Sequence, residues 1–313
     1  MPRRNKGQGN ARMEETTYIH PPEFNKMPDT MSAEDFSILN RAIQEKKRLH
    51  ISYFNRAQNK DETIMIGPYG ILYGVRIFRL GWYILAFCHK TKQIRAFNFI
   101  HINKMTPLDD SRFELPQNFS VKKYTIEVLD KAEKLYEEGN KLVSKDEDEK
   151  AVQFYEKAIS LYPAYGDAHF SLALSYRVID QEALEEFEKA LEYECTDPDL
   201  VYYQLSDYLF SEGKKDEAID ACRNAIEIKP EDTGYHIHLA EIYANMKKYK
   251  EAIKEYQEVI ELKPEWEDME DIKEFKKVYQ GLADCYKKIY RMDKAKECLD
   301  ILHDLTLEEE TEE

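Results

Sequence analysis

The sequence predicts a two-domain protein in which a small β domain with an N-terminal helix precedes an all-α solenoid of repeats. Its 313 residues suffice for about two domains of ordinary size. Short apolar runs rich in Ile, Tyr and Phe occupy the first 124 residues, whereas Ala, Leu, Glu and Lys dominate the rest. In that second part a pattern of large and small apolar residues recurs every 34 residues, which is typical of a repeat protein.

The net charge changes sign at the same boundary. Up to Tyr124 there are 20 Lys and Arg against 12 Asp and Glu, which gives +8, whereas the remainder holds 25 against 49, which gives −24. A mildly basic module therefore precedes a strongly acidic one. We expect a flexible segment at 1–31, a β domain at 32–124, a solenoid at 125–309 and an acidic tail at 310–313.

Composition also restricts the class of protein. The 22 Tyr and 14 Phe are more aromatic residues than a disordered chain contains. The longest run without a charged residue, 63–75, has 13 residues, fewer than the roughly 20 that a membrane-spanning helix needs. The basic N-terminus has no apolar segment behind it, and the five cysteines form no CxxC pair. We therefore expect a cytoplasmic protein with reduced thiols and no membrane partner.

The first predicted element is a helix that begins after Ser32. Ser32 is a favourable N-cap residue, and Asp35 follows three positions later. Phe36, Leu39 and Ile43 lie on one face at helical spacing.

Six strand-like runs follow this helix. They are LHISYF, ETIMIG, VRIFRL, WYILAFCH, QIRAFNF and HINKMTPL, and turn-like NRAQNKD, PYG, LG and HKTK lie between them. One helix and about five antiparallel strands in so short a segment predict a small, strongly bent sheet, that is, an open barrel.

The amino-acid sequence of these strands is distinctive. GWYILAF is followed by QIRAFNFIHI, with ISY upstream, a Pro in IGPYGIL and FELPQNF downstream. This pattern, over residues 36–120, resembles the WYL-domain family, with Ile84 as the third residue of the Trp-Tyr-Leu run and Arg95 and Phe97 as its Arg-x-Phe. The resemblance implies an Sm-like or SH3-like β-barrel behind a helix, and a sensor or regulatory module. Several members of the family bind nucleic-acid ligands.

The chain departs from that family at two points. His101 stands where a second Arg is usual, so anion affinity would be weaker and pH-dependent. The family's regulators also carry a winged helix-turn-helix, which needs more than the 31 residues before Ser32, so we do not expect this protein to recognise an operator.

Cationic and aromatic side chains alternate in the β domain, and this combination holds single-stranded nucleic acid, with stacking worth about 1–3 kcal/mol per base. The alternative is that the aromatic side chains fill a small barrel, and both interpretations stay open for Arg79 and Arg95. The predicted ligand-binding residues are Tyr53, Arg76, Arg79, Trp82, Tyr83, Arg95 and His101.

The second half contains five copies of one pattern. Copies begin at Ala132, Gly166, Asp199 and Thr233, and a fifth follows after nine additional residues. Each has a small residue at position 8 and Ala at 20. Position 4 is Leu, Tyr or His, and most copies have an aromatic residue at 24 and Pro at 32. This pattern resembles the tetratricopeptide family. The resemblance implies stacked helix pairs forming a superhelix whose concave groove binds peptides or protein segments.

The predicted groove residues lie on the first helix of each repeat. The segment EEGNKL resembles the Gly-Asn of chaperone-binding repeats, but Tyr136 occupies the place of the Lys that would clamp a carboxylate. Together with the net charge of −24, this favours a basic or neutral partner over an acidic C-terminal tail. The predicted groove residues are Tyr136, Asn140, Phe170, Leu174, Tyr203, Asp207, Glu241, Asn245 and Asp284.

We find no motif of a nucleotide-hydrolysing loop, a serine hydrolase or a zinc protease, and His236 and His238 lie on different sides of a helix turn, a poor metal pair. The sequence therefore predicts a non-enzymatic regulatory adaptor with no cofactor and no metal. Its β domain would sense a nucleotide-like or single-stranded nucleic-acid ligand, and its groove would bind a protein partner. The alternative is a protein-assembly scaffold in which the β domain is another protein-binding surface. The oligomeric state is not predicted.

Overall fold

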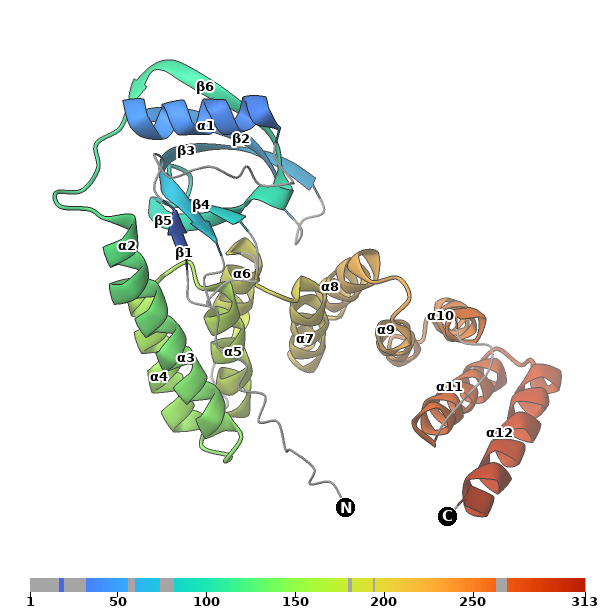
Figure 1. Ribbon diagram of the computed structural model, residues 1–313. Coiled ribbons are helices and arrows are strands. Elements are labelled where there is room, and N and C mark those ends of the chain that lie inside the picture. Colours follow the sequence, from blue (N-terminus) through green and yellow to red (C-terminus); the bar gives the residue numbers. More distant parts are fainter. Residues whose placement is uncertain are drawn as a thin grey trace, which may run out of the picture. The chain divides into compact units, whose positions relative to one another are not determined.

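The computed structural model describes residues 17–19, 32–55, 60–73, 82–179, 182–193, 195–262 and 269–312 (Figure 1). Contacts divide the chain into two compact units, with the division between Ser175 and Tyr176. Each unit is described by itself.

The predicted N-terminal helix is present as α1, Ala33–Glu45. The Ser32 hydroxyl accepts a hydrogen bond from the Asp35 backbone N–H at 3.0 Å, which is the expected N-cap. The helix ends at Lys46, whose φ of 55° is left-handed. In Figure 1, α1 lies across the strands of the sheet.

The strands form one antiparallel sheet with the order β5-β4-β3-β2-β6, and β1 pairs with β3. This confirms the predicted fold class of the first half. The sheet is open, however, because β5 and β6 form its two ends and do not pair with each other among the described residues. The open sheet agrees with the strand pattern, whereas the closed Sm-like or SH3-like barrel that the resemblance implied is not formed by the described strands. The strands are β1 Thr17–Ile19, β2 Lys47–Asn55, β3 Lys60–Tyr73, β4 Trp82–Cys88, β5 Gln93–Asn98 and β6 Ile102–Arg112.

One predicted turn is also wrong. The PYG segment lies within β3, where the register to β4 shifts between Pro68 and Gly70. A Cβ on Gly70 would lie 2.7 Å from Val121 Cγ2, so this glycine permits close packing of α2, Val121–Tyr124. The predicted VRIFRL strand lies outside the described residues. Part of the segment expected to be flexible, Thr17–Ile19, forms β1.

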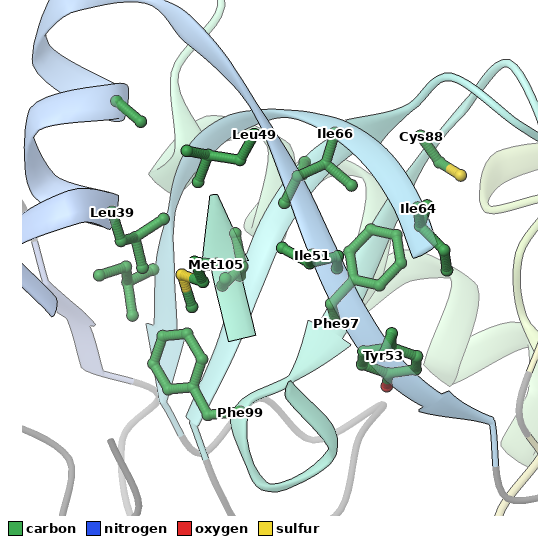
Figure 2. Close-up of a cluster of buried hydrophobic side chains, with 14 residues drawn as sticks. Leu39, Leu49, Ile51, Tyr53, Ile64, Ile66, Cys88, Phe97, Phe99 and Met105 are labelled. Carbon is green, nitrogen blue, oxygen red and sulfur yellow. The ribbon is translucent and has the colours of Figure 1, made fainter. Parts of the chain in front are cut away.

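One face of the sheet packs with α1 around a hydrophobic core (Figure 2). Burial alternates along β2, as expected of a strand with one face in a core. The buried cluster comprises Leu39, Ala42, Leu49, Ile51, Tyr53, Ile64, Ile66, Ile71, Ile84, Ala86, Cys88, Phe97, Phe99 and Met105.

A second, aromatic cluster joins the sheet to the first repeat within the same unit. The Phe119 ring lies 4.6 Å from that of Tyr69 and 5.6 Å from that of Tyr124. Burial raises the pKa of Tyr124, and the neighbouring Tyr162 and Tyr69 raise it further. Tyr162, only 2% exposed, accepts a hydrogen bond through its hydroxyl from Ala96 N of the end strand β5 at 3.4 Å.

The second half forms a solenoid of helix pairs, as predicted. A π-helical turn, Thr125–Leu129, leads into it. The last helix continues to Glu312, where the sequence suggested a tail. The pairs are α3 Asp130–Val143 with α4 Asp148–Leu161, α5 Gly166–Val178 with α6 Leu184–Glu192, α7 Pro198–Ser211 with α8 Lys215–Ile228, α9 Thr233–Asn245 with α10 Tyr249–Leu262, and α11 Met269–Lys288 with α12 Met292–Glu312.

The small residue at repeat position 8 has the expected structural role. A Cβ on Gly139 would lie 2.5 Å from the ring of Tyr155, the aromatic residue at position 24 of the same repeat. In the third repeat, position 8 is Ser206, whose buried hydroxyl donates to the carbonyl of Ala218 at position 20. The two helices of each pair therefore approach closely at these positions.

Histidine at position 4 joins successive repeats. His169 Nε2 lies 3.0 Å from the carbonyl oxygen of Pro163, and His236 Nε2 lies 3.1 Å from that of Pro230. Both prolines end the preceding repeat, so each contact fixes the turn between two repeats.

Candidate functional site

The second unit presents a set of contacting side chains on its first helices. We call Tyr203, Asp207, His238, Glu241 and Lys277, from α7, α9 and α11, the first-helix face. The Tyr203 ring lies edge-on to the His238 ring at 5.0 Å. Asp207 and Glu241 raise the pKa of Tyr203 and of His238, and Lys277 lowers both. These electrostatic influences place the five side chains close together.

The carboxylates predicted for the groove are paired with cations. Asp207 accepts from Arg177 Nη2 at 2.6 Å, and Glu241 from Lys277 Nζ at 2.9 Å. Asp284 lies 3.2 Å from Lys287 Nζ. Because these pairs are partly exposed, each contributes about 0–1 kcal/mol to stability. Their main effect is to leave this surface close to neutral, although the half-chain carries −24.

Burial sets the protonation of the first-helix face. It lowers the pKa of His238, against the opposing influence of Asp207 and Glu241. It raises the pKa of Tyr203, and Asp207 acts in the same direction. Near pH 7 the face therefore carries a neutral imidazole and a protonated phenol.

The groove residues predicted in the first two repeats lie in the other unit. Tyr136, in place of the clamp Lys, packs with its ring 5.1 Å from that of Tyr165 and accepts from Ser171 Oγ. Asn140 Oδ1 accepts from the Tyr155 hydroxyl at 2.7 Å. Phe170 and Leu174 are half-buried. In the second unit, Asn245 Oδ1 accepts from Lys215 Nζ at 2.6 Å.

Three of the ligand residues predicted in the β domain are brought together around Phe97. The Tyr53 ring lies 5.4 Å from Phe97 and 6.0 Å from His101, and the Arg95 guanidinium lies 5.3 Å from the Phe97 centroid. Arg95 is only 6% exposed, and Tyr53 and Tyr83 are also buried. These groups are packed rather than presented to solvent.

The remaining predicted ligand residues differ in placement. Trp82 is partly buried and packs against the core, and His101 is half-buried. Arg76 and Arg79 lie outside the described residues.

The β4–β5 hairpin contains polar groups that sequence reasoning missed. His89 Nε2, Thr91 Oγ1 and Gln93 Oε1 of the hairpin, and Arg48 Nε of strand β2, are fully buried and have no hydrogen-bond partner among the described residues. Burial lowers the pKa of His89, and Arg48 and Lys92 lower it further. These polar residues belong to no recognisable motif, so the sequence gave no signal for them.

Metal and thiol chemistry has little basis in the described residues. They contain no cluster of His, Cys, Asp and Glu suited to a metal ion. All five cysteines are free and buried, and burial raises the pKa of Cys222 to about 12, which makes its thiol a poor nucleophile. None of the described helices combines the length and apolar character that a bilayer crossing requires.

Comparison with known proteins gives a clear assignment for the first half. Residues 34–107 match the model of the WYL domain. The uncharacterized protein MJ0572 of Methanocaldococcus jannaschii is 40% identical over 70 residues, which cover 22% of this chain and 81% of that protein. This chain belongs to the WYL-domain family. In this WYL protein, residues 135–165 match a tetratricopeptide repeat, and residues 180–259 match the model of anaphase-promoting complex subunit 3.

Solved structures show the fold of the solenoid. The protein MamA is 23% identical, with a TM-score of 0.50, and the match covers 55% of this chain and 96% of that one. MamA from residue 41 of Desulfovibrio magneticus RS-1 is 16% identical, with a TM-score of 0.50, and covers 57% of this chain and 97% of that one. A tetratricopeptide solenoid therefore follows the WYL domain.

Proposed function

We propose that this protein is a non-enzymatic regulatory adaptor. Its solenoid binds a protein segment at the first-helix face, and its WYL domain senses a nucleotide-like or single-stranded nucleic-acid ligand. The observation that carries the proposal is the first-helix face itself, where a partly exposed Tyr203 lies near Asp207, Glu241 and Lys277 and their ion pairs. An aromatic side chain among fixed polar groups is a common anchor for a bound segment.

Peptide binding tests the solenoid half of the proposal. Fluorescence anisotropy would compare three capped peptides of equal length, one neutral and rich in Gln and Ser, one rich in Lys, and one acidic and ending in EEVD. We expect the acidic peptide to bind most weakly, because the half-chain carries −24 and the clamp position holds Tyr136.

Variants locate the binding surface. Tyr203→Ala should weaken binding of the preferred peptide, whereas Tyr290→Ala, which changes a side chain 90% exposed elsewhere, should not. Tightest binding of the acidic peptide, or equal effects of the two variants, would contradict the proposal.

The WYL half is supported by the net charge of +8 before residue 125. Binding of a short single-stranded DNA to the full chain should weaken with salt, with a log-log slope of about −0.7 per phosphate contact. Trp82→Leu should reduce affinity without changing the slope, because stacking releases no counterions. Arg95→Ala should instead destabilise the domain, since Arg95 is buried.

The competing function is the protein-assembly scaffold, in which the WYL domain contacts another protein. Folded protein that binds neither single-stranded DNA nor a mononucleotide at about 50 mM salt would favour the scaffold. Circular dichroism must accompany each variant to show that it is folded.

A further inference from the structure

One histidine of the first-helix face has its tautomer fixed by the protein. The hydroxyl of Ser206, 0% exposed, lies 2.8 Å from the carbonyl oxygen of Ala218 and 3.1 Å from His238 Nε2. A carbonyl oxygen only accepts, so the single hydroxyl hydrogen points to Ala218. The Ser206 oxygen must therefore accept from His238, which places the imidazole proton on Nε2.

The other ring nitrogen is consequently a bare acceptor. Burial lowers the pKa of His238, so the ring holds no second proton near pH 7. No described residue bonds to Nδ1, and Nδ1 is not among the fully buried side-chain atoms that lack a partner. His238 retains 9% of its exposure, beside the ring of Tyr203. A hydrogen-bond acceptor with a fixed direction thus faces the surface.

The charges around this acceptor select what it can bind. The charged groups that act on the pKa of His238 are Glu241 of the same helix, α9, and Asp207 of α7 and Lys277 of α11. The carboxylates are paired with Arg177 and Lys277, so the surroundings are neutral. An incoming carboxylate has no hydrogen to donate and would meet the lone pair of Nδ1. A Lys or Arg can donate to Nδ1, but it would give up its hydration for surroundings without net charge. A neutral N–H group donates without that desolvation cost.

We propose that His238 Nδ1 accepts a hydrogen bond from an amide N–H, of the backbone or of an Asn or Gln side chain, in a neutral protein segment bound across Tyr203. This assignment rests on the proposed function of the solenoid, and it names the chemistry of the partner: uncharged and rich in amides. The neighbouring ion pairs offer complementary donors and acceptors to the rest of the same segment.

The tautomer is tested on the free protein, without any ligand. In ¹⁵N-histidine-labelled full-length protein at pH 7, we expect the His238 resonances to show a protonated Nε2 and an unprotonated Nδ1. A protonated Nδ1, or an imidazolium, overturns the inference whatever the solenoid binds.

The ligand chemistry is tested with the neutral Gln/Ser peptide. Binding should shift the His238 Nδ1 resonance in the direction of hydrogen-bond acceptance. His238→Gln places an amide near the Nε2 position and loses the Nδ1 acceptor, so affinity should fall roughly three- to tenfold. His238→Asn keeps an acceptor near Nδ1 and should retain more affinity. His303→Gln, at an exposed position on α12, is the matched control.

The outcomes separate this inference from the proposed function. If the neutral peptide binds but leaves Nδ1 unshifted and His238→Gln binds equally well, the inference is overturned and the adaptor proposal stands. If no peptide of the three binds to folded protein, the adaptor proposal fails and the ligand assignment fails with it. Should His238→Gln not fold, the Nδ1 shift in the unaltered protein decides the question.

Discussion

Two histidines of α9 show how partners decide the state of a residue. His238 faces a hydroxyl that accepts from it, and burial keeps it neutral. His236, two residues earlier, has Glu255 Oε2 at 3.0 Å from Nδ1 and the Pro230 carbonyl at 3.1 Å from Nε2. Both of those partners only accept, so both contacts are hydrogen bonds only when both ring nitrogens carry a proton, and the pKa of His236 is accordingly raised. The spacing in HIH predicted a poor metal pair, but it could not indicate that the pKa of His236 is raised and that of His238 lowered.

The stability contributed by His236 should depend on pH. The hydrogen bond to Glu255 is the largest cause that raises the folded-state pKa of His236 above its ordinary 6.5. A raised folded pKa contributes stability that is fully present below pH 6.5 and is lost as pH rises through the folded pKa. His236→Gln should therefore lower the free energy of unfolding by about 1–3 kcal/mol at pH 6 and by less at pH 9. Urea denaturation at both pH values measures this.

The exposed His303 provides the control for this experiment, because His303→Gln should cost little at either pH. A loss for His236→Gln that is the same at pH 6 and pH 9 would show that the imidazolium adds nothing beyond packing.

At the scale of helices and strands, repeat spacing was the more informative signal. The 34-residue pattern located helix pairs, because small residues and aromatic residues at fixed positions must meet across each pair. Strand patterns located β2, β4, β5 and β6, but Pro and Gly in PYG suggested a turn where β3 continues through a register shift. Both residues also occur at bulges, and only the packing of Val121 against Gly70 distinguishes the two cases.

Two glycine substitutions test the close approach within a helix pair. Gly139→Ala places a Cβ against the Tyr155 ring, and we expect it to destabilise the protein by about 1–3 kcal/mol despite the better helix propensity of Ala. Gly213→Ala meets no atom within 4 Å but imposes a side chain at φ +78°, at a cost of about 1 kcal/mol.

A further substitution separates the two causes. Tyr155→Leu combined with Gly139→Ala should recover part of the loss, whereas the same Tyr155→Leu should not rescue Gly213→Ala. Thermal unfolding of the four proteins gives the comparison, and an unrescued double variant would point to backbone strain at Gly139 instead.

For the whole molecule, the first 124 residues do not form a separate compact unit. The aromatic cluster of Tyr69, Phe119 and Tyr124 extends to Tyr162 in the first repeat, and the structural division falls between Ser175 and Tyr176. Composition and charge change at Tyr124, but both are properties of the local sequence and carry no information on which surfaces are buried together. The ion pairs of the candidate site could not be predicted from local sequence either, because the cations that neutralise Asp207 and Glu241 come from other repeats.

Two fragments test this shared packing. A fragment of residues 32–124 lacks Tyr162 and should expose the aromatic cluster, so we expect dye binding to exposed apolar surface and a melting temperature well below that of residues 32–179. Removal of a buried Tyr typically costs about 3–5 kcal/mol. In the full chain, Tyr162→Phe removes only the hydroxyl that bonds Ala96 N, and should cost about 0.5–1.5 kcal/mol. Equal melting temperatures for the two fragments would contradict shared packing.

The burial of Tyr162 also bears on how such an array can change in length. A stack of repeats exposes an apolar surface at each end, and arrays commonly carry a polar terminal repeat to shield it. Here Ala132 and Tyr162 of the first repeat are buried, as is Leu129 just before it, and Ala96 of the sheet donates to the Tyr162 hydroxyl. The WYL domain therefore covers part of the first repeat, in the way that a terminal capping repeat would. Duplication or loss of repeats can occur within the array or at its far end, while the first repeat has to keep the residues that fit the sheet.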